Sequence, residues 1–185
     1  MIYVNDNHFD QDYFDFCSEK FQKHEVLGNA KGKRLTVCIN DTALWVALCL
    51  YAKAHDISVF PLPADTPIEA VRRRAMLSAS HYLMVASNLD ELLENFEEIS
   101  DHEHDIEPVL MQMSSGTTGE PKCIDRTWKS IDIELDHYIQ HFSELDSMTT
   151  VVACPVNHSY GLICGVLATI KRGAAPVIVN NFNPK

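Results

Sequence analysis

The chain has 185 residues, of which 46% are hydrophobic and 22% are charged, and this balance is typical of a globular protein with one domain or a domain and a small lobe. Its formal net charge of -11 argues against a nucleic-acid partner, because phosphates recruit Lys and Arg. Six cysteines without a CxxC pair, no signal peptide and apolar runs too short to span a bilayer predict a cytoplasmic protein with reduced thiols and no membrane partner.

The N-terminal half of the sequence predicts helices that alternate with short apolar strands. Residues 1–8 are polar and predict a loosely held segment, and an amphipathic helix is expected from Asp10 to about His24. The next expected elements are a strand over 35–39, a helix capped by Asn40 or Asp41, a strand over 57–62, a helix through Leu77 with a capping box at Thr66–Glu69, a strand over 82–86 and a helix from Asn88 to about Glu98.

The C-terminal half continues the alternation. The expected elements are strands over 107–113 and 122–126, a helix over 128–142 capped by Thr127, a strand over 151–154, a helix over 160–171 ended by Gly173, and a strand over 175–179. Strands that alternate with helices at this spacing form right-handed βαβ units. We therefore predict an α/β fold with a mainly parallel sheet covered by helices on both faces.

The segment SSGTTGEPK, Ser114 to Lys122, joins two of these strands and is rich in hydroxyls, with two glycines and a closing lysine. Glycine lets a backbone approach an anion closely, and N–H groups, hydroxyls and a lysine all bind phosphate oxygens. The same composition also occurs in ordinary polar hairpin turns, and this alternative stays open. The segment lacks the spacing of a Walker A loop.

As a whole string, the segment resembles the phosphate loop of the adenylate-forming superfamily, which includes acyl- and aryl-CoA synthetases, luciferases and adenylation domains. The resemblance matches every defining position from Ser114 to Lys122, and Cys123 stands where glycine is usual. It implies that ATP phosphates are held by Ser114, Ser115, Gly116, Thr117, Thr118 and Gly119, and that Lys122 offsets their charge. Residues 35–87 also resemble the early strands and helices of this superfamily.

A second motif, PVNHSYG over 155–161, follows an apolar strand. A lone histidine after a strand is often a surface or packing residue. In the adenylate-forming superfamily, however, a histidine or aromatic residue near a glycine lines the acyl pocket at this place. The resemblance implies that His158 orients the substrate carboxylate or gates the thiol channel, and that the acid is an acyl or aryl acid.

The resemblance implies a reaction in two halves. A carboxylic acid attacks the α-phosphorus of ATP, with Mg²⁺ as the expected metal, and gives an acyl-adenylate and pyrophosphate. The thiol of CoA or of a carrier-protein phosphopantetheine then displaces AMP. His102 and His104 stand in an acidic stretch, but histidines two apart in a polar loop do not predict a metal site, and no protein metal site is expected.

The resemblance covers the chain from about Leu35 onward and only the front part of the superfamily's members. It implies that residues 1–185 are the N-terminal subdomain of an AMP-binding domain, without the second lobe or the C-terminal domain that carries the catalytic lysine. We therefore expect an N-terminal fragment of an ATP-dependent acid–thiol ligase that is inactive alone and that works with the remainder of its polypeptide, and with an acyl carrier protein if that is the acceptor. The alternatives are a split-ligase subunit completed by a complementary chain and a short non-catalytic protein. An exposed apolar surface would permit a homodimer.

Overall fold

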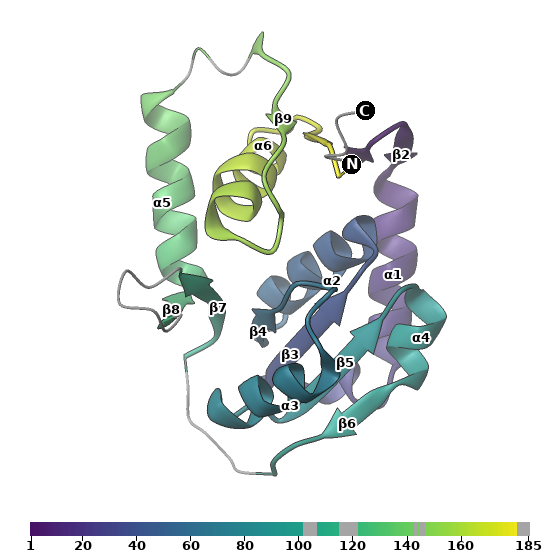
Figure 1. Cartoon of the computed structure of the whole chain (residues 1–185). Coiled ribbons are helices and arrows are strands. Elements are labelled where there is room, and N and C mark those ends of the chain that lie inside the picture. The colour runs from purple at the N-terminus through teal and green to yellow at the C-terminus, as the bar shows by residue number, and fades with distance from the viewer. Residues whose placement is uncertain (102–106, 115–121, 143, 145–146, 181–185) are drawn as a thin grey trace. The chain divides into compact units, whose positions relative to one another are not determined.

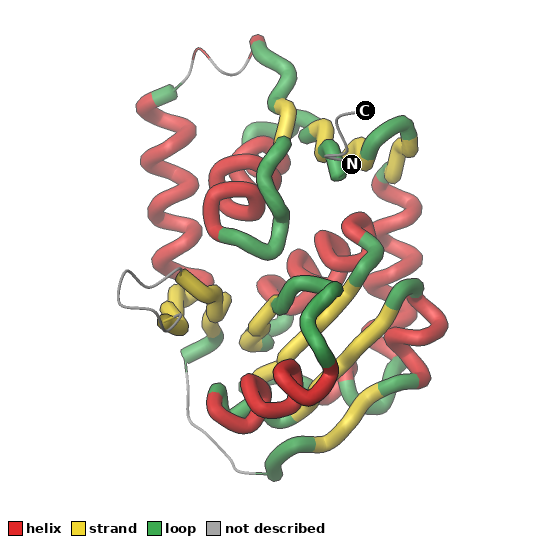
Figure 2. The backbone as a smooth tube through the Cα atoms, viewed as in Figure 1, coloured by secondary structure: helices red, strands yellow, loops and turns green. Residues whose placement is uncertain are grey.

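The structure is a computed structural model, and it describes residues 1–101, 107–114, 122–142, 144 and 147–180. The chain divides into two compact units, which we describe one at a time. The larger unit is Asp15–Trp128, and the smaller unit combines Met1–Phe14 with Lys129–Lys185. Each unit contains its own sheet, and Figures 1 and 2 show the elements along the chain.

Among the described residues, the larger unit has a six-stranded sheet of order β6-β5-β3-β4-β7-β8. The strands are β3 (Arg34–Ile39), β4 (Ser58–Pro61), β5 (Tyr82–Ala86), β6 (Phe96–Glu98), β7 (Val109–Ser114) and β8 (Lys122–Thr127). The four inner strands run parallel, and the edge strands β6 and β8 pair antiparallel with their neighbours. The mainly parallel sheet predicted from the sequence is confirmed.

Helices connect these strands and cover the sheet. They are α1 (Gln11–Lys23), which begins in the smaller unit, α2 (Thr42–Ala54), α3 (Ile68–Leu77), α4 (Leu89–Glu94) and a short 3-10 turn, Leu27–Asn29. Helix α2 connects β3 to its neighbour β4. Helix α3 then connects β4 to β5, which is the neighbour of β3 at its other edge. Because such crossovers are right-handed, α2 and α3 lie on opposite faces of the sheet.

An apolar cluster lies beneath α3. Val71 and Ala75 of α3 pack against side chains from the strands below them. These partners are Cys38, Phe60, Leu62, Leu83 and Met111. Every residue of β4 and the first five of β3 are buried, as expected for strands covered on both faces.

The smaller unit contains a four-stranded sheet of order β2-β1-β10-β9 among its described residues. Its elements are β1 (Ile2–Val4), β2 (Asn7–Phe9), α5 (Trp128–His141), which begins at the last residue of the larger unit, β9 (Val151–Val152), a π-helix (Tyr160–Leu167), α6 (Ala168–Lys171) and β10 (Val177–Ile178). The expectation that residues 1–8 are loosely held is wrong, because β1 pairs with β10 from the other end of the chain and buries Ile2.

Three local expectations in the rest of the chain also need correction. The helix that begins after Asn88 ends at Glu94, and residues 96–98 form β6, in which Phe96 packs edge-on to the ring of Tyr82. The capping box does not form, since Pro67 is the N-cap of α3 and supplies no side-chain hydrogen bond. The helix expected over 160–171 is π-helical for its first eight residues and α-helical for its last four.

Other caps follow the sequence. The Asp41 side chain accepts a hydrogen bond from the backbone N–H of Leu44 at 3.0 Å, and Asn88 does the same for Glu91 at 2.9 Å. Gly173 follows α6 with a positive φ of 79°, a conformation that glycine adopts without strain. Within the described residues, no helix is both long enough and apolar enough to cross a membrane.

Candidate functional site

The β7–β8 hairpin holds the two described ends of the SSGTTGEPK segment. Ser114 ends β7, Lys122 begins β8, and the two are directly opposed in the antiparallel register. The Ser114 hydroxyl donates a hydrogen bond to the backbone carbonyl of Lys122 at 3.4 Å, and the Lys122 side chain is exposed. The predicted strands on both sides of the loop are therefore confirmed.

The other end of the hairpin is fixed to the core of the same unit. The backbone N–H of Val109 donates to the Ser58 hydroxyl at 3.1 Å, which ties β7 to β4. Trp128 follows β8 and donates twice, from its backbone N–H to the Pro108 carbonyl at 3.1 Å and from its indole to the Ile57 carbonyl at 2.9 Å. These buried hydrogen bonds make the hairpin a rigid support for the loop.

The remaining predicted phosphate ligands, Ser115, Gly116, Thr117, Thr118 and Gly119, lie outside the described residues. Of the phosphate-loop residues, the structure places Ser114 and Lys122, and it brings these two together as a cross-strand pair. Ser114 carries a hydroxyl and Lys122 an ammonium group, and they stand directly before and after the segment 115–121. Both are groups that bind phosphate oxygens.

His158 belongs to the smaller unit and lies in the turn between β9 and the π-helix. Its backbone N–H donates to the Pro155 carbonyl at 3.2 Å, and its own carbonyl accepts from the N–H of Leu162 at 2.9 Å. These backbone contacts fix the turn, and the residue is exposed. The imidazole is therefore available to a ligand as a hydrogen-bonding group.

Gly161 has no side chain, and this lets the backbone pass close to the segment before His158. A side-chain Cβ at this position would lie 2.5 Å from the Pro155 carbonyl oxygen and 2.9 Å from that of Cys154. Contacts of that length do not occur between real Cβ atoms and backbone oxygens. The glycine of the PVNHSYG motif is therefore required by the close approach of two backbone segments.

No cluster of three or more His, Cys, Asp or Glu side chains with the geometry of a metal site occurs among the described residues. His102 and His104, weighed above as metal ligands, lie outside them.

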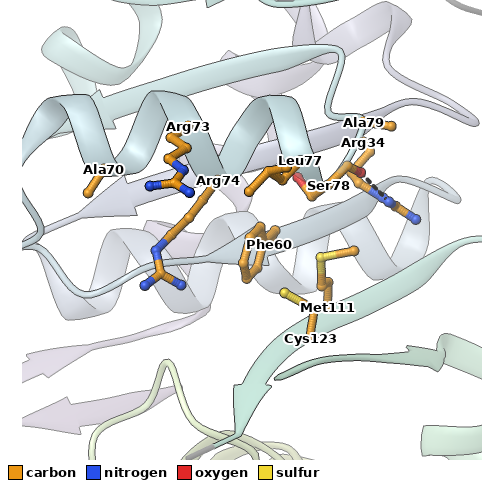
Figure 3. A pocket seen from close by; sticks show the side chains of 10 residues that line it. All are labelled: Arg34, Phe60, Ala70, Arg73, Arg74, Leu77, Ser78, Ala79, Met111 and Cys123. Carbon is orange, nitrogen blue, oxygen red and sulfur yellow. Dashed lines mark hydrogen bonds between the residues drawn. The ribbon is translucent and has the colours of Figure 1, made fainter. Parts of the chain in front are cut away.

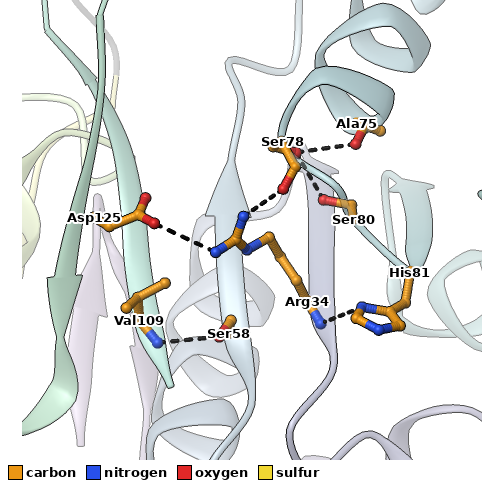
Figure 4. Close-up of polar contacts among 8 residues, drawn as sticks. All are labelled: Arg34, Ser58, Ala75, Ser78, Ser80, His81, Val109 and Asp125. Atoms are coloured by element: carbon orange, nitrogen blue, oxygen red, sulfur yellow. Dashed lines mark hydrogen bonds and ion pairs between the residues drawn. The ribbon is translucent and has the colours of Figure 1, made fainter. Parts of the chain in front are cut away.

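Sequence reasoning missed a buried arginine that connects three elements of the larger unit (Figure 4). The Arg34 guanidinium on β3 donates to the Ser78 carbonyl after α3 and, at 3.3 Å, to the Asp125 carboxylate on β8. The backbone N–H of Arg34 donates to Nδ1 of His81 at 3.0 Å. A single arginine at the start of an apolar strand gives no sign in the sequence that it is buried.

Comparison with known sequences agrees with this arrangement. The sequence profile of the AMP-binding enzyme family matches residues 29–185. A 3,4-dihydroxybenzoate–[aryl-carrier protein] ligase of Bacillus anthracis is 35% identical over 187 aligned residues, which cover 100% of this chain and 44% of that protein. A 4-coumarate–CoA ligase-like protein of Arabidopsis thaliana is 28% identical over 128 residues, 66% of this chain and 23% of that protein.

Solved structures show the same fold. An o-succinylbenzoate CoA synthetase from Bacillus subtilis matches with a TM-score of 0.73 at 16% identity, over 97% of this chain and 40% of that one. The N-terminal subdomain of NpsA from Klebsiella oxytoca, in complex with anthranilyl-AMSN, matches with a TM-score of 0.73 at 15% identity, over 100% of this chain and 51% of that one.

The chain thus spans less than half the length of the curated relatives it matches. The match of the family profile over most of the chain, the identity to the Bacillus anthracis ligase and the fold support the same assignment. This chain belongs to the AMP-binding enzyme family of adenylate-forming proteins, and it corresponds to the N-terminal part of its members.

Proposed function

We propose that residues 1–185 are the N-terminal, phosphate-binding subdomain of an ATP-dependent ligase that activates an aryl acid and passes it to a thiol. The observation that carries this proposal is the β7–β8 hairpin, which pairs Ser114 with Lys122 at the base of the family's phosphate loop. The aryl acid is suggested by the dihydroxybenzoate ligase, which aligns over the whole chain.

In this proposal the hydroxyls and N–H groups of residues 114–119 hold the β- and γ-phosphates of ATP. Lys122 offsets the negative charge that remains on pyrophosphate as it leaves. Donors fixed before the reaction stabilise such charge without reorganising, and this is the usual source of catalysis in phosphoryl chemistry. The anchoring of the hairpin through Trp128 and Ser58 supplies the required rigidity.

His158 is assigned to the acid. The imidazole, exposed on a turn fixed by Gly161, would orient the carboxylate or control the approach of the thiol. A neutral imidazole both donates and accepts hydrogen bonds, so it suits a group that must bind an anion without trapping it. ATP with Mg²⁺, and the thiol of CoA or a carrier protein, are parts of the same proposal.

Residues that contact adenine and ribose, and the catalytic lysine, are assigned to other parts of the ligase. The segment 1–185 by itself is therefore expected to bind ATP weakly and to form no adenylate. A split ligase, in which a complementary chain supplies these groups, would behave in the same way until the partner is added.

ATP–pyrophosphate exchange tests the proposal. The full-length protein is assayed with hydroxylated benzoates, with fatty acids and with amino acids as separate groups. We expect exchange that depends on a benzoate and is absent with segment 1–185 alone. Exchange with fatty acids or amino acids only would overturn the aryl-acid assignment, and no exchange with any acid would overturn the ligase activity. Exchange by segment 1–185 alone would overturn its assignment as an incomplete subdomain.

A further inference from the structure

A pocket of about 520 Å³ lies in the larger unit, between α3 and the strands β7 and β8 (Figure 3). Its large apolar lining residues are Phe60, Leu77 and Met111. Leu77 is the exposed one, at 77%, whereas Phe60 and Met111 are buried. The pocket extends along α3 from Ala70 to beyond Leu77, which is about 10 Å at the helical rise per residue. Its volume is within the range of pockets that bind small organic molecules.

Two cations lie at one end of this pocket. Arg73 and Arg74 extend from α3 on the side of Ala70, as Figure 3 shows. Among the described residues, Arg73 makes no hydrogen bond or ion pair, and the one polar contact of the Arg74 guanidinium is the sulfur of Met113. Neither positive charge is therefore neutralised by a carboxylate in the described part of the chain.

Arg72, which precedes Arg73 in α3, differs from the two arginines that follow it because it is paired with acids. Arg72 is hydrogen-bonded to the carboxylate of Glu97 at 2.9 Å and to that of Glu69 at 3.0 Å, and these contacts raise its pKa. It does not line the pocket. Of these three consecutive arginines, Arg72 is paired with acids, whereas Arg73 and Arg74 line the pocket and have no carboxylate partner within the part of the chain that the structure describes.

Arg34 lines the opposite end, near Ala79 (Figure 3). Its side chain is only 8% exposed, and Ser78 and Asp125 accept hydrogen bonds from two of its nitrogens, but the buried Nε–H has no acceptor among the residues that the structure describes. A buried donor without an acceptor costs free energy that a ligand oxygen would recover. Because Asp125 already offsets the charge of Arg34, the anionic group of a ligand belongs at the Arg73 and Arg74 end.

We propose that this pocket binds an amphipathic anion, an acyl or aryl group that carries a phosphate or carboxylate. Arg73 and Arg74 hold the oxyanion, since guanidinium groups match phosphate and carboxylate oxygens in pairs. The apolar part lies along the exposed Leu77, next to the buried Phe60 and Met111, and an oxygen at its far end accepts from Arg34. Among the described residues, the lining includes neither Ser114 nor Lys122, and the proposed site goes beyond the proposed ligase function.

Cys123 gives a local readout, because this exposed thiol on β8 lines the pocket. In the full-length protein, alkylation of Cys123 by iodoacetamide is followed by peptide mass spectrometry with octyl phosphate, octanoate, inorganic phosphate or 1-octanol as the probe. Cys154, which belongs to the smaller unit, is the internal control. Octyl phosphate and octanoate distinguish the two kinds of oxyanion.

We expect octyl phosphate or octanoate to slow alkylation of Cys123 by about tenfold when present at about ten times its Kd, and to leave Cys154 unchanged. Inorganic phosphate and 1-octanol each lack half of the required chemistry and should protect weakly. The double variant Arg73→Ala/Arg74→Ala should lose the protection, whereas the matched variant Arg72→Ala should keep it.

The proposal is overturned if neither amphiphile protects Cys123, if inorganic phosphate protects equally well, or if the double variant is protected like the wild type. Lys122→Ala separates this site from the ATP site. Protection, expressed as the ratio of rates without and with the amphiphile, should persist in that variant. Its loss there would assign the probe to the phosphate loop and overturn the pocket as a separate site.

Discussion

Ser114 and Lys122 lie directly opposite each other at the end of the β7–β8 hairpin, with the serine hydroxyl 3.4 Å from the lysine carbonyl oxygen. The two described ends of the proposed phosphate loop are thus held by strand pairing, and the strands are held by Ser58 and Trp128. Lys122 is exposed and takes no part in the core. Its replacement therefore separates ligand binding from folding.

We expect Lys122→Ala to raise the KM for ATP in pyrophosphate exchange by about 10- to 100-fold, the value of one hydrogen bond to a charged group. The melting temperature should stay unchanged, because no buried contact is lost. Lys129→Ala removes an exposed lysine seven residues later and serves as the matched control. An unchanged KM in the Lys122 variant would remove this lysine from the ATP site.

Gly161→Ala tests the turn that carries His158. The new methyl group would meet backbone oxygens at 2.5 and 2.9 Å, so the turn or the π-helix must move, and we expect a loss of about 2 to 3 kcal/mol in the free energy of unfolding. Gly165→Ala is the matched comparison. There a Cβ would meet the Val152 side chain at 2.8 Å, and a side chain adjusts more easily than backbone.

Urea denaturation of both variants measures the difference. If the two glycines cost the same free energy, backbone crowding at Gly161 is not what shapes the turn. The full-length Gly161→Ala protein should also lose more exchange activity than Gly165→Ala, since a Cβ at Gly161 meets the backbone of Cys154 and Pro155, nearer to His158 than the Val152 side chain that Gly165 faces.

Much of the fold was predictable because its signals are local. The strands that end at Ser114 and begin at Lys122 were predicted because a motif stands between two short apolar or β-rich runs. The strands β3 and β5 were predicted from apolar runs between helices. β1 was missed because its partner, β10, lies at the other end of the chain. No local pattern in residues 1–8 indicates that they pair with a strand near the other end of the chain.

The site was predictable only in part for a related reason. Ser114, Lys122 and His158 stand in motifs, so a sequence can identify them. Arg34, Arg73 and Arg74 were not singled out, because a pocket forms from elements that the fold brings together. The sequence contains three consecutive arginines, but it does not show which one pairs with Glu97. Glu97 lies on β6, and the sequence predicted this segment as part of a helix.

Arg34→Met tests the two hydrogen bonds by which Arg34 on β3 connects the end of α3 to β8. Methionine fills much of the same space but leaves the Ser78 carbonyl without its donor and Asp125 without its cation, so we expect a loss of about 2 to 3 kcal/mol in unfolding free energy. Asp125→Asn should cost less, about 1 kcal/mol, because the Asp125 side chain is 45% exposed and solvent screens the pair. Equal stability of Arg34→Met and wild type would contradict a structural role for this arginine.

We expect the Cys49 thiol to make the stability of the protein depend on alkaline pH. Its complete burial in α2 raises the pKa of the thiol from 9.0 to about 12, so the folded state keeps the proton at a pH where the unfolded state has released it. The contribution of the protonated Cys49 thiol to the free energy of unfolding is fully present below pH 9 and is lost as the pH rises through 12. Over this window it amounts to about 4 kcal/mol, at about 1.4 kcal/mol per pKa unit.

We expect the free energy of unfolding to fall more steeply between pH 9 and 12 in the wild type than in Cys49→Ala. The variant is less stable at pH 7 because of the cavity that it creates, so the slope against pH, and not the absolute value, is the relevant measurement. Burial also raises the pKa of Tyr51 and Cys38, and these groups give both proteins a residual slope. Parallel curves for the two proteins would show that Cys49 does not stay protonated in the folded state.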